Sequence, residues 1–324
     1  MNIKIFVSFR NGVKSKIIPS TIYYPVLCGK AISDDSLLKI DGDDSGDNIS
    51  YYRNKLGELT VQYWAWKNFD CDYYGLCHYH RYLSFTEEKF KLNRDGLVTE
   101  FILNHDSIEK YNFHQAAICN CVDKYDAVVN KSYAVNKLFT PRGHVGTEIE
   151  FWKAYDGMYI DNMVLNELIN TIKKVKPELS GATDGYMNGK YHRGYNCYVM
   201  RKDLFYEMCE FQFNVIFLME EKIKQMNHLK GSERTLGYLG EIMYGIYVYY
   251  LQQQGKYKIK ELQLVYFEQT ELPDSRLAYW LQKILYKMKF QFEDIGYVLL
   301  PKGSPRRNFV KKIYFALTGK NKNK

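Results

Sequence analysis

The chain has 324 residues and a formal net charge of +8, and 46% of its residues are hydrophobic. This composition is typical of a folded globular protein and excludes a largely disordered chain. The last 24 residues, 301–324, hold six Lys, two Arg and no acidic residue, so the rest of the chain is neutral overall. A body without excess positive charge argues against a nucleic-acid-binding protein.

Seven cysteines without a CxxC pair, and an N-terminus without a secretory leader, predict reduced thiols in a cytoplasmic protein. The longest nearly apolar stretch, about 242–251, is too short to cross a bilayer, which takes about 20 residues. Cys119 and Cys121 have no second pair of matched ligands, so a metal site there is disfavoured.

The first part of the chain alternates apolar strands with polar loops. Strands are predicted at 4–9 and 73–77, with an extended segment at 22–26. Residues 33–50 are rich in aspartate, glycine and serine, which is the composition of a loop. A helix is predicted at 54–68, because apolar and aromatic residues recur there at spacings of three and four.

The later part is richer in predicted helices. In chain order we expect a strand at 125–130, helices at 148–155 and 161–175, a loop at 180–190, a strand at 195–200, helices at 203–227 and 235–254, and a strand at 258–267. Strands that alternate with helices predict an α/β sheet covered on both faces. No repeat or linker divides the chain, so one domain is expected at 1–300, followed by a separate tail at 301–324.

The tail mixes apolar and basic residues. Phe309, Ile313, Phe315 and Leu317 stand among four Arg and Lys residues at 306–312. A basic amphipathic segment of this kind is suited to lie on an anionic membrane surface.

His78, His80 and Arg81 follow the predicted strand 73–77 directly. Parallel α/β sheets bind ligands at the carboxyl ends of their strands, so we expect these side chains to face an anionic ligand. If the extended conformation continues, His78 and His80 share one face and would contact phosphate oxygens together with Arg81. The alternatives are a metal ion held by the two histidines and a pair of surface histidines without a ligand.

The loop 43–50 is a second candidate. Asp44, Asp47 and Asn48 supply hydrogen-bonding groups, and Gly46 allows a tight turn. Such a loop is suited to hold a base or ribose, although a purely structural turn is the alternative. The loop lacks the bidentate glutamate that would complete a calcium site.

Glu241 stands among apolar and aromatic residues of the predicted helix 235–254. A carboxylate in such surroundings either faces solvent or is buried. Burial would raise its pKa toward the range of a general base. Both interpretations remain open from the sequence.

Taken together, these segments resemble the bacterial domain-of-unknown-function family 4422, which comprises capsular polysaccharide and exopolysaccharide biosynthesis proteins regarded as GT-A-type glycosyltransferases. The resemblance spans about residues 3–255. The matching residues are Ile22-Tyr23-Tyr24-Pro25-Val26, Gly29, Ala31, Asp44-Ser45-Gly46-Asp47-Asn48-Ile49-Ser50, Glu58-Leu59-Thr60, Tyr63-Trp64-Ala65-Trp66-Lys67-Asn68, Tyr74-Gly75-Leu76-Cys77-His78-Tyr79-His80-Arg81-Tyr82, Tyr195-Asn196-Cys197-Tyr198-Val199-Met200, Leu204, Phe205 and Gly237-Tyr238-Leu239-Gly240-Glu241. The chain departs from the family at His80, where an arginine is expected, and at Gly240, where a serine is usual.

The resemblance implies a GT-A-like, Rossmann-type mixed sheet flanked by helices, with a nucleotide-sugar-binding half at 1–130 and an acceptor-binding half at 131–300. It implies transfer of a sugar, with galactose as a guess, from a UDP-sugar to a glycan carried on undecaprenyl diphosphate. Such transfer builds the repeat units of capsule, exopolysaccharide or O-antigen. The protein would then be cytoplasmic and peripheral on the inner face of the cell membrane, where the basic tail also fits.

On this interpretation His78, His80 and Arg81 contact the diphosphate, and a cationic cluster there would replace the usual divalent metal (Mn or Mg). Glu241 would act as the general base, with His78 and Arg81 as its catalytic partners. The residues expected to hold the nucleotide are Val7, Ser8, Arg10, Asp44, Gly46, Asp47 and Asn48. Two other functions remain as alternatives: a non-catalytic nucleotide- or glycan-binding protein of a polysaccharide assembly complex, and a histidine-dependent metallohydrolase.

Overall fold

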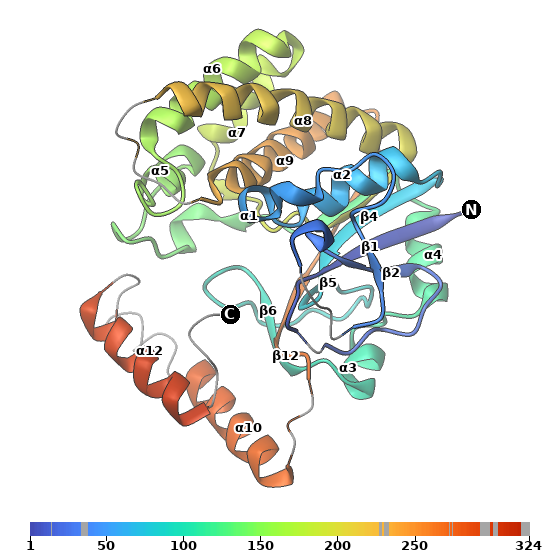
Figure 1. Ribbon diagram of the computed structural model, residues 1–324, viewed down its shortest axis with the longest axis vertical. Helices are drawn as coiled ribbons and strands as arrows, with labels where there is room; N and C mark the ends of the chain where they lie inside the picture. Colours follow the sequence, from blue (N-terminus) through green and yellow to red (C-terminus); the bar gives the residue numbers. More distant parts are fainter. Residues whose placement is uncertain are drawn as a thin grey trace.

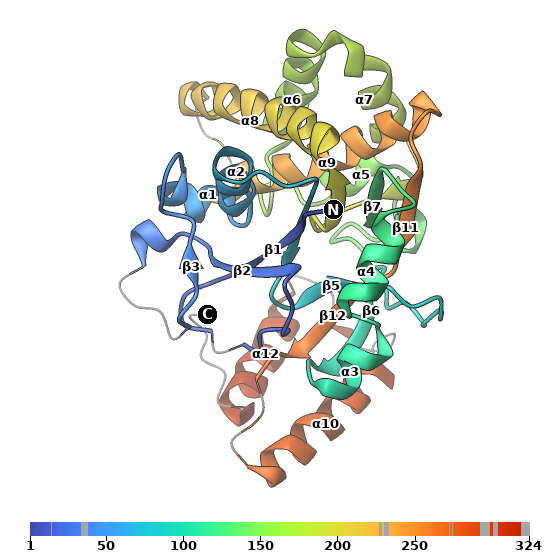
Figure 2. The same cartoon turned by 90° about the vertical axis from the view of Figure 1, so that its right-hand side faces the viewer.

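The computed structural model shows a mixed α/β protein whose central sheet is flanked by helices (Figures 1 and 2). This confirms the predicted fold class, including the helix-rich later part of the chain. The structure describes all residues except 14, 34–37, 227–228, 230–232, 272, 274, 292–298, 301–303 and 319–324.

Within the described residues, ten strands form the central sheet. They are β1 (Ile3–Phe9), β2 (Tyr23–Leu27), β3 (Asp41–Gly42), β4 (Tyr73–His78), β5 (Arg81–Leu83), β6 (Val98–Ile102), β7 (Ala127–Asn130), β10 (Tyr198–Arg201), β11 (Ile259–Leu262) and β12 (Leu264–Gln269). The main order is β11-β7-β10-β4-β1-β2-β3, and β12 joins β5 and β6 beside it. A separate pair consists of β8 (Tyr133–Ala134) and β9 (Tyr191–His192).

Strand direction determines where a ligand is expected. Strands β1 to β4 run parallel to one another, so their carboxyl ends share one edge of the sheet. Strand β10 is antiparallel to both of its neighbours, β4 and β7. The mixed sheet therefore has a parallel half whose carboxyl edge gathers the loops after β1, β2, β3 and β4.

The pleat of β1 explains why the sheet has two cores. Ile5 and Val7 are buried on one face of the sheet, and Phe6 is buried on the other. This follows the two-residue period of a strand that is covered on both sides. The face of Phe6 packs against α2 and α8, and the opposite face packs against α4.

The helices are α1 (Arg53–Leu56), α2 (Leu59–Asn68), α3 (His105–Lys110), α4 (Gln115–Val122), α5 (Glu148–Lys153), α6 (Asn162–Val175), α7 (Ser180–Met187), α8 (Lys202–Gln225), α9 (Thr235–Gln254), α10 (Arg276–Gln291) and α12 (Pro305–Thr318). Helices α6 to α9 gather above the sheet with α2, while α10 and α12 lie apart from this layer (Figure 1). The Asp161 side chain caps α6 by accepting a hydrogen bond from Met163 N at 2.8 Å. None of the helices in the described part of the chain is both long and apolar enough to cross a bilayer.

Two predictions about helices are wrong. The segment 54–68 forms two helices, because Gly57 between them has a φ of +57°, outside the helical region. The predicted loop 180–190 is largely helix α7, because its residues Ala182 and Met187 pack in the core despite the surrounding glycines and polar residues. The helices expected at 148–155, 161–175, 203–227 and 235–254 are confirmed as α5, α6, α8 and α9.

Two predictions about strands need correction. The strand expected at 195–200 begins only at Tyr198, because Tyr195 and Asn196 have φ values of 72° and 29°. The strand expected at 258–267 is two strands, β11 and β12, which pair with different neighbours. Of the predicted tail, residues 305–318 form α12, whereas 301–303, 319–324 and the side chains of Phe315 and Leu317 lie outside the described part.

Candidate active site

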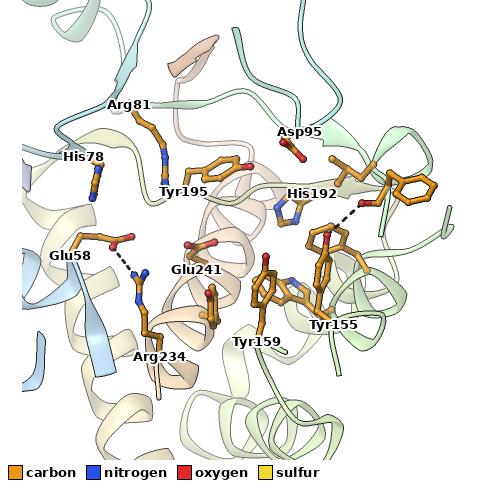
Figure 3. Close-up of a pocket in the computed structure, with 15 residues that line it drawn as sticks. Glu58, His78, Arg81, Asp95, Tyr155, Tyr159, His192, Tyr195, Arg234 and Glu241 are labelled. Carbon is orange, nitrogen blue, oxygen red and sulfur yellow. Dashed lines mark hydrogen bonds and ion pairs between the residues drawn. The ribbon is translucent and has the colours of Figure 1, made fainter. Parts of the chain in front are cut away.

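A pocket of about 260 Å³ lies beside the carboxyl ends of the parallel strands (Figure 3). It is lined by Glu58, His78, Arg81, Asp95, Leu138, Phe139, Phe151, Trp152, Tyr155, Tyr159, His192, Tyr195, Arg234, Tyr238 and Glu241. Three of the predicted site residues, His78, Arg81 and Glu241, are therefore brought together. In Figure 3, Glu241 lies between a basic side with His78 and Arg81 and an aromatic side with Tyr155 and Tyr159.

The chain reverses directly after His78. Tyr79 and His80 form a two-residue turn, and His78 pairs with Arg81 across the antiparallel strands β4 and β5. The turn is fixed by neighbouring backbones: Tyr79 N donates to Ser8 O at 3.1 Å, and Phe267 N donates to His80 O at 2.9 Å. The extended conformation therefore ends at His78, and the condition under which His78 and His80 would share one face of a strand is not met.

This turn leaves only His78 in the pocket lining, although the rings of the two histidines stay in contact. Arg81 returns beside His78 and lines the pocket, with its guanidinium 4.8 Å from the ring centre of Tyr195. The His80 ring packs against the rings of Tyr79 and Tyr266, with centroids 4.7 and 4.9 Å away, and is not among the lining residues.

The environment of the two imidazoles makes them neutral at neutral pH. Burial, the nearby His80 and the guanidinium of Arg81 hold the pKa of His78 well below its usual value. Burial, Arg81 and Arg10 lower the pKa of His80 to about 3. The positive charge on this side of the pocket therefore comes from arginines rather than from the imidazoles.

Both imidazoles keep an unpaired polar atom. Nδ1 of His78 and Nε2 of His80 are buried without a hydrogen-bonding partner among the described residues. Leaving such an atom unpaired costs about 1–3 kcal/mol, so it is often a sign of a missing ligand or water. Since His78 lines the pocket, a ligand there has an imidazole within reach.

Glu241 is held in the middle of the pocket by α9. Burial is the main cause that raises its pKa, and the nearby carboxylate of Glu58 adds to this effect. Arg81, His192 and a hydrogen bond from the backbone N–H of Tyr195 oppose the rise. Glu241 is half-buried and lines the pocket, so of the two interpretations the structure favours a pocket carboxylate with a raised pKa over one that faces bulk solvent.

Glu58 is placed by the break between α1 and α2. It accepts a hydrogen bond from Asn196 Nδ2 at 3.2 Å, and its other oxygen lies 3.7 Å from Nη2 of Arg234. Arg234 directly precedes α9, the helix that carries Glu241. Three carboxylates, those of Glu58, Asp95 and Glu241, and the guanidinium groups of Arg81 and Arg234 thus line one pocket.

A buried pair, His192 and Glu148, was not predicted from the sequence. Nδ1 of His192 lies 2.9 Å from Oε1 of Glu148, whose side chain is fully buried. Glu148 also accepts hydrogen bonds from Trp152 Nε1 at 2.7 Å and from the Tyr186 hydroxyl at 3.2 Å. The carboxylate therefore has several donors, and it fixes the orientation of a pocket-lining imidazole.

The pair also determines the charge of His192. Burial alone would lower the pKa of His192, but the charge and hydrogen bond of Glu148, together with Glu241, outweigh it and raise the pKa. A Cβ atom added to Gly194 would lie 2.8 Å from Nε2 of His192 and 3.3 Å from Oε2 of Glu241. Gly194 thus allows the imidazole and the carboxylate to approach each other.

Stacked tyrosines form the opposite side of the pocket. The ring centroids of Tyr155 and Tyr159 are 4.5 Å apart, and those of Tyr159 and Tyr238 are 4.7 Å apart. Phe151 packs against the His192 ring at 4.4 Å. A wall of aromatic rings beside a few polar groups is typical of a small-molecule site. No sequence pattern predicted this stack, because its members come from separate segments.

The end of β1 lies close to the basic side but not in the lining. Val7 and Ser8 are buried, and Ser8 pairs with His78 in the parallel register of β1 and β4. Arg10 follows the strand, and its charge lowers the pKa of both His78 and His80. Contact of Val7, Ser8 or Arg10 with a nucleotide stays a prediction.

The loop after β3 is held mainly by Asp43, which was not among the predicted site residues. Its buried carboxylate accepts hydrogen bonds from Gly29 N at 2.9 Å, Lys30 N at 3.1 Å, Ser50 Oγ at 2.6 Å and Thr60 Oγ1 at 2.5 Å. These bonds connect the loops after β2 and β3 to α2. The loop is therefore an ordered part of the carboxyl edge of the sheet.

The predicted nucleotide-binding residues of this loop bind one another and α2. Asn48 Nδ2 donates to the carbonyls of Asp44 and Gly46, and Asp47 exchanges backbone hydrogen bonds with the Asn68 side chain. None of the four predicted residues lines the pocket. Their contact with a base or ribose stays a prediction, whereas the hydrogen bonds show that they stabilise the loop and connect it to α2.

No group of three or more His, Cys, Asp or Glu side chains gathers as metal ligands in the described part of the chain. The rings of His78 and His80 have centroids 4.4 Å apart but lack such a third partner. A metal ion held by His78 and His80 therefore stays a prediction, with no third protein ligand among the described residues.

Comparison with known proteins supports the resemblance seen in the sequence. No curated protein matches the chain. A solved apo structure of WbbM, a bifunctional glycosyltransferase, is similar with a TM-score of 0.74 and 28% identity. The match covers 85% of this chain and 48% of that one, so the chain spans about half the length of WbbM. A family model described as "Domain of unknown function (DUF4422)" matches residues 4–254, and the chain therefore belongs to this family.

Proposed function

We propose that the protein is a glycosyltransferase that moves a sugar from a nucleotide-sugar donor to a hydroxyl group of a glycan acceptor. The observation that carries the proposal is one pocket in which Arg81, His78 and Glu241 meet a stack of tyrosines. The likeness to WbbM supports the same reaction class. The UDP-sugar, the galactosyl group and the lipid-linked acceptor are finer parts of the proposal that rest on the family resemblance.

The basic side of the pocket would receive the donor diphosphate. The guanidinium of Arg81 offers donors in a fixed planar geometry that matches phosphate oxygens. A neutral His78 can donate one N–H to the same group, and a bound anion would raise its pKa and favour the charged form. Charge that develops on the departing diphosphate would thus be stabilised where it forms.

The aromatic side would receive sugar rings. Tyr155, Tyr159 and Tyr238 line this side of the pocket and would contact the C–H groups of a sugar through the part of the stack that faces the pocket, while Glu58 is placed to accept hydrogen bonds from hydroxyl groups. This arrangement would orient donor and acceptor with little conformational adjustment, which is a large part of catalysis in group transfer.

Glu241 would act as the general base. It takes the proton of the acceptor hydroxyl, the oxygen forms a bond to the anomeric carbon, and the bond from that carbon to the diphosphate oxygen breaks. A base with a raised pKa is stronger, provided that it remains ionised at the working pH. The cationic form of His192 lowers the pKa of Glu241, so the His192–Glu148 pair would keep the base ionised against the influence of Glu58.

The test is donor binding and transfer by the purified full chain. A panel of nucleotide sugars, with and without Mn²⁺, is screened by thermal shift, and the donor that stabilises the protein is used with a soluble glycan acceptor. We expect Arg81→Ala to lower kcat/KM at least about a hundredfold, because it removes a charged contact that strengthens in the transition state. The matched control is Arg201→Ala, since Arg201 pairs with Tyr73 at the opposite end of β4.

Equal turnover by Arg81→Ala and wild-type protein would remove the basic side from the mechanism. Nucleotide-sugar binding without transfer or donor hydrolysis would favour the alternative of a non-catalytic binding protein. Loss of all activity with EDTA, restored by Mn²⁺, would show that Arg81 and His78 do not replace a metal.

A further inference from the structure

Helix α10 is attached to the sheet by one face. The rings of Tyr279 and Tyr286 contact Phe101 of β6, with centroids 5.4 and 5.5 Å away. The Tyr286 hydroxyl donates a hydrogen bond to Thr99 O at 2.8 Å. Tyr279 and Tyr286 are seven residues apart, two helical turns, so the same side of the helix faces the sheet. The orientation of α10 is therefore fixed by contacts to the body of the protein.

The opposite face of α10 is apolar and exposed. Six apolar side chains between positions 277 and 288 form this face. At about 100° per residue, their positions lie on the side of the helix away from Tyr279 and Tyr286. Their exposed fractions are 71% for Leu277, 58% for Trp280, 53% for Leu281, 51% for Ile284, 40% for Leu285 and 49% for Met288. A continuous exposed stripe of this size on a folded protein usually marks an interaction surface.

Helix α12 shows the same combination of exposure and composition. Phe309, Val310 and Ile313 have exposed fractions of 64%, 44% and 45%. Neither 276–291 nor 305–318 contains an acidic residue. Their basic residues are Arg276, Lys283, Lys287 and Lys289 on α10 and Arg306, Arg307, Lys311 and Lys312 on α12.

We propose that α10 and α12 together form a docking surface for an anionic lipid membrane. The exposed apolar side chains would enter the boundary between headgroups and acyl chains, with Trp280 at the level that tryptophan prefers. The exposed basic residues Arg276, Lys287, Arg306, Lys311 and Lys312 would contact anionic headgroups. The sequence pointed only to the tail 301–324, whereas the structure adds α10 and shows that it is fixed to β6 by its opposite face.

The charge pattern favours a membrane over a second copy of the chain as the occupant. Two copies that met through this surface would bring eight basic residues and no acidic residue of each copy together. Such like charges repel unless a partner neutralises them. An anionic bilayer supplies both the negative charge and the apolar layer that the surface requires. The inference does not depend on the proposed reaction.

The test is co-sedimentation of the full chain with vesicles of phosphatidylcholine, with or without phosphatidylglycerol, in the absence of nucleotide and sugar. We expect binding only to vesicles with phosphatidylglycerol, and weaker binding as salt increases. The double variant Trp280→Glu and Ile284→Glu should lower the partition coefficient at least about tenfold, since it places two charges in the apolar stripe. The matched control, Met163→Glu and Leu218→Glu, changes exposed apolar residues of α6 and α8 and should bind as the wild type does.

A second variant, Lys311→Glu with Lys312→Glu, should abolish the preference for phosphatidylglycerol. The proposal would be overturned if the wild-type protein did not bind the vesicles. It would also be overturned if the control variant of Met163 and Leu218 lost as much vesicle binding as the variant of Trp280 and Ile284. A wild-type dimer that the Trp280 variant converts to a monomer, with vesicle binding unchanged, would assign the surface to a second copy instead. Transfer to a soluble acceptor, measured on the same variants, should stay unchanged, so failure of the reaction and failure of membrane docking are distinguishable.

Discussion

Replacing Glu148 by glutamine should shift the acidic limb of the pH–activity profile to higher pH. The substitution keeps the size of the side chain that contacts His192 and Trp152, but it removes the negative charge. Without that charge, burial lowers the pKa of His192, and the imidazole becomes neutral at neutral pH. Glu241 then loses a cationic neighbour that lowers its pKa, while the repulsion from Glu58 remains.

The size of the effect follows from the geometry around Gly194. Because Nε2 of His192 and Oε2 of Glu241 would lie 2.8 and 3.3 Å from one added Cβ atom, these two atoms are at most about 6 Å apart. Unit charges at about 6 Å interact with roughly 3 kcal/mol at an effective dielectric constant of about 20. This corresponds to roughly a hundredfold in the fraction of ionised base at acidic pH.

The assay is kcat/KM of transfer against pH for the wild type, Glu148→Gln and a control, Glu150→Gln. Glu150 lies in the same turn of α5, but it accepts its hydrogen bonds from Gly146 N and Thr147 N outside the pocket. We expect Glu148→Gln to approach wild-type activity only at high pH, where Glu241 is ionised without help from His192. An acidic limb that stays in place or moves to lower pH would refute the role assigned to the His192–Glu148 pair.

Three further outcomes are expected. Gly46→Ala should lower the free energy of unfolding in urea by about 1–3 kcal/mol, because Gly46 has a φ of +59° and an added Cβ would lie 1.9 Å from Asn68 Oδ1. The control is Gly143→Ala: Gly143 has a φ of +91° but no atom within 4 Å of the added Cβ, so this variant measures the backbone contribution alone. Tyr159→Ala should raise KM for a sugar substrate roughly tenfold while leaving the affinity for the free nucleoside diphosphate unchanged, and an equal loss of both would contradict the assignment of the stack to sugar. The pKa of His192 is raised in the folded state, so its protonation stabilises the protein fully below the ordinary pKa near 6.5, and this contribution disappears as the pH rises through the raised value. Urea titrations from pH 6 to 9 should show this decrease in the free energy of unfolding for the wild type and not for Glu148→Gln.

Part of the site could be predicted because some of its residues are recognisable from the strand or helix to which they belong. His78 and Arg81 follow a buried strand of a parallel sheet, and the carboxyl edge of such a sheet is where ligands bind. Glu241 stood out as a carboxylate within an apolar helix whose predicted bounds agree with α9. The position of His80 was missed because no glycine or proline signals the two-residue turn, which the backbones of Ser8 and Phe267 stabilise.

The rest of the site depends on contacts between distant segments. His192 and Glu148 are 44 residues apart and meet only after α5 packs beside β9. The stacked tyrosines likewise come from the segment after α5 and from α9. Asp43 is one of several aspartates in its loop, and only the folded loop shows that it alone accepts bonds from Gly29 and Lys30. Periodicity and composition carry no information about such pairings.

The position of β10 has a consequence for biosynthesis. This strand lies between β4 and β7, yet it is translated about 70 residues after β7. Until it emerges from the ribosome, the nascent chain has two unpaired strand edges in the middle of its future sheet, and such edges invite pairing with other chains. Release of a chain that ends before Tyr198 should therefore give an aggregation-prone fragment, and chaperone contact during synthesis should fall once residues through Arg201 can join the sheet.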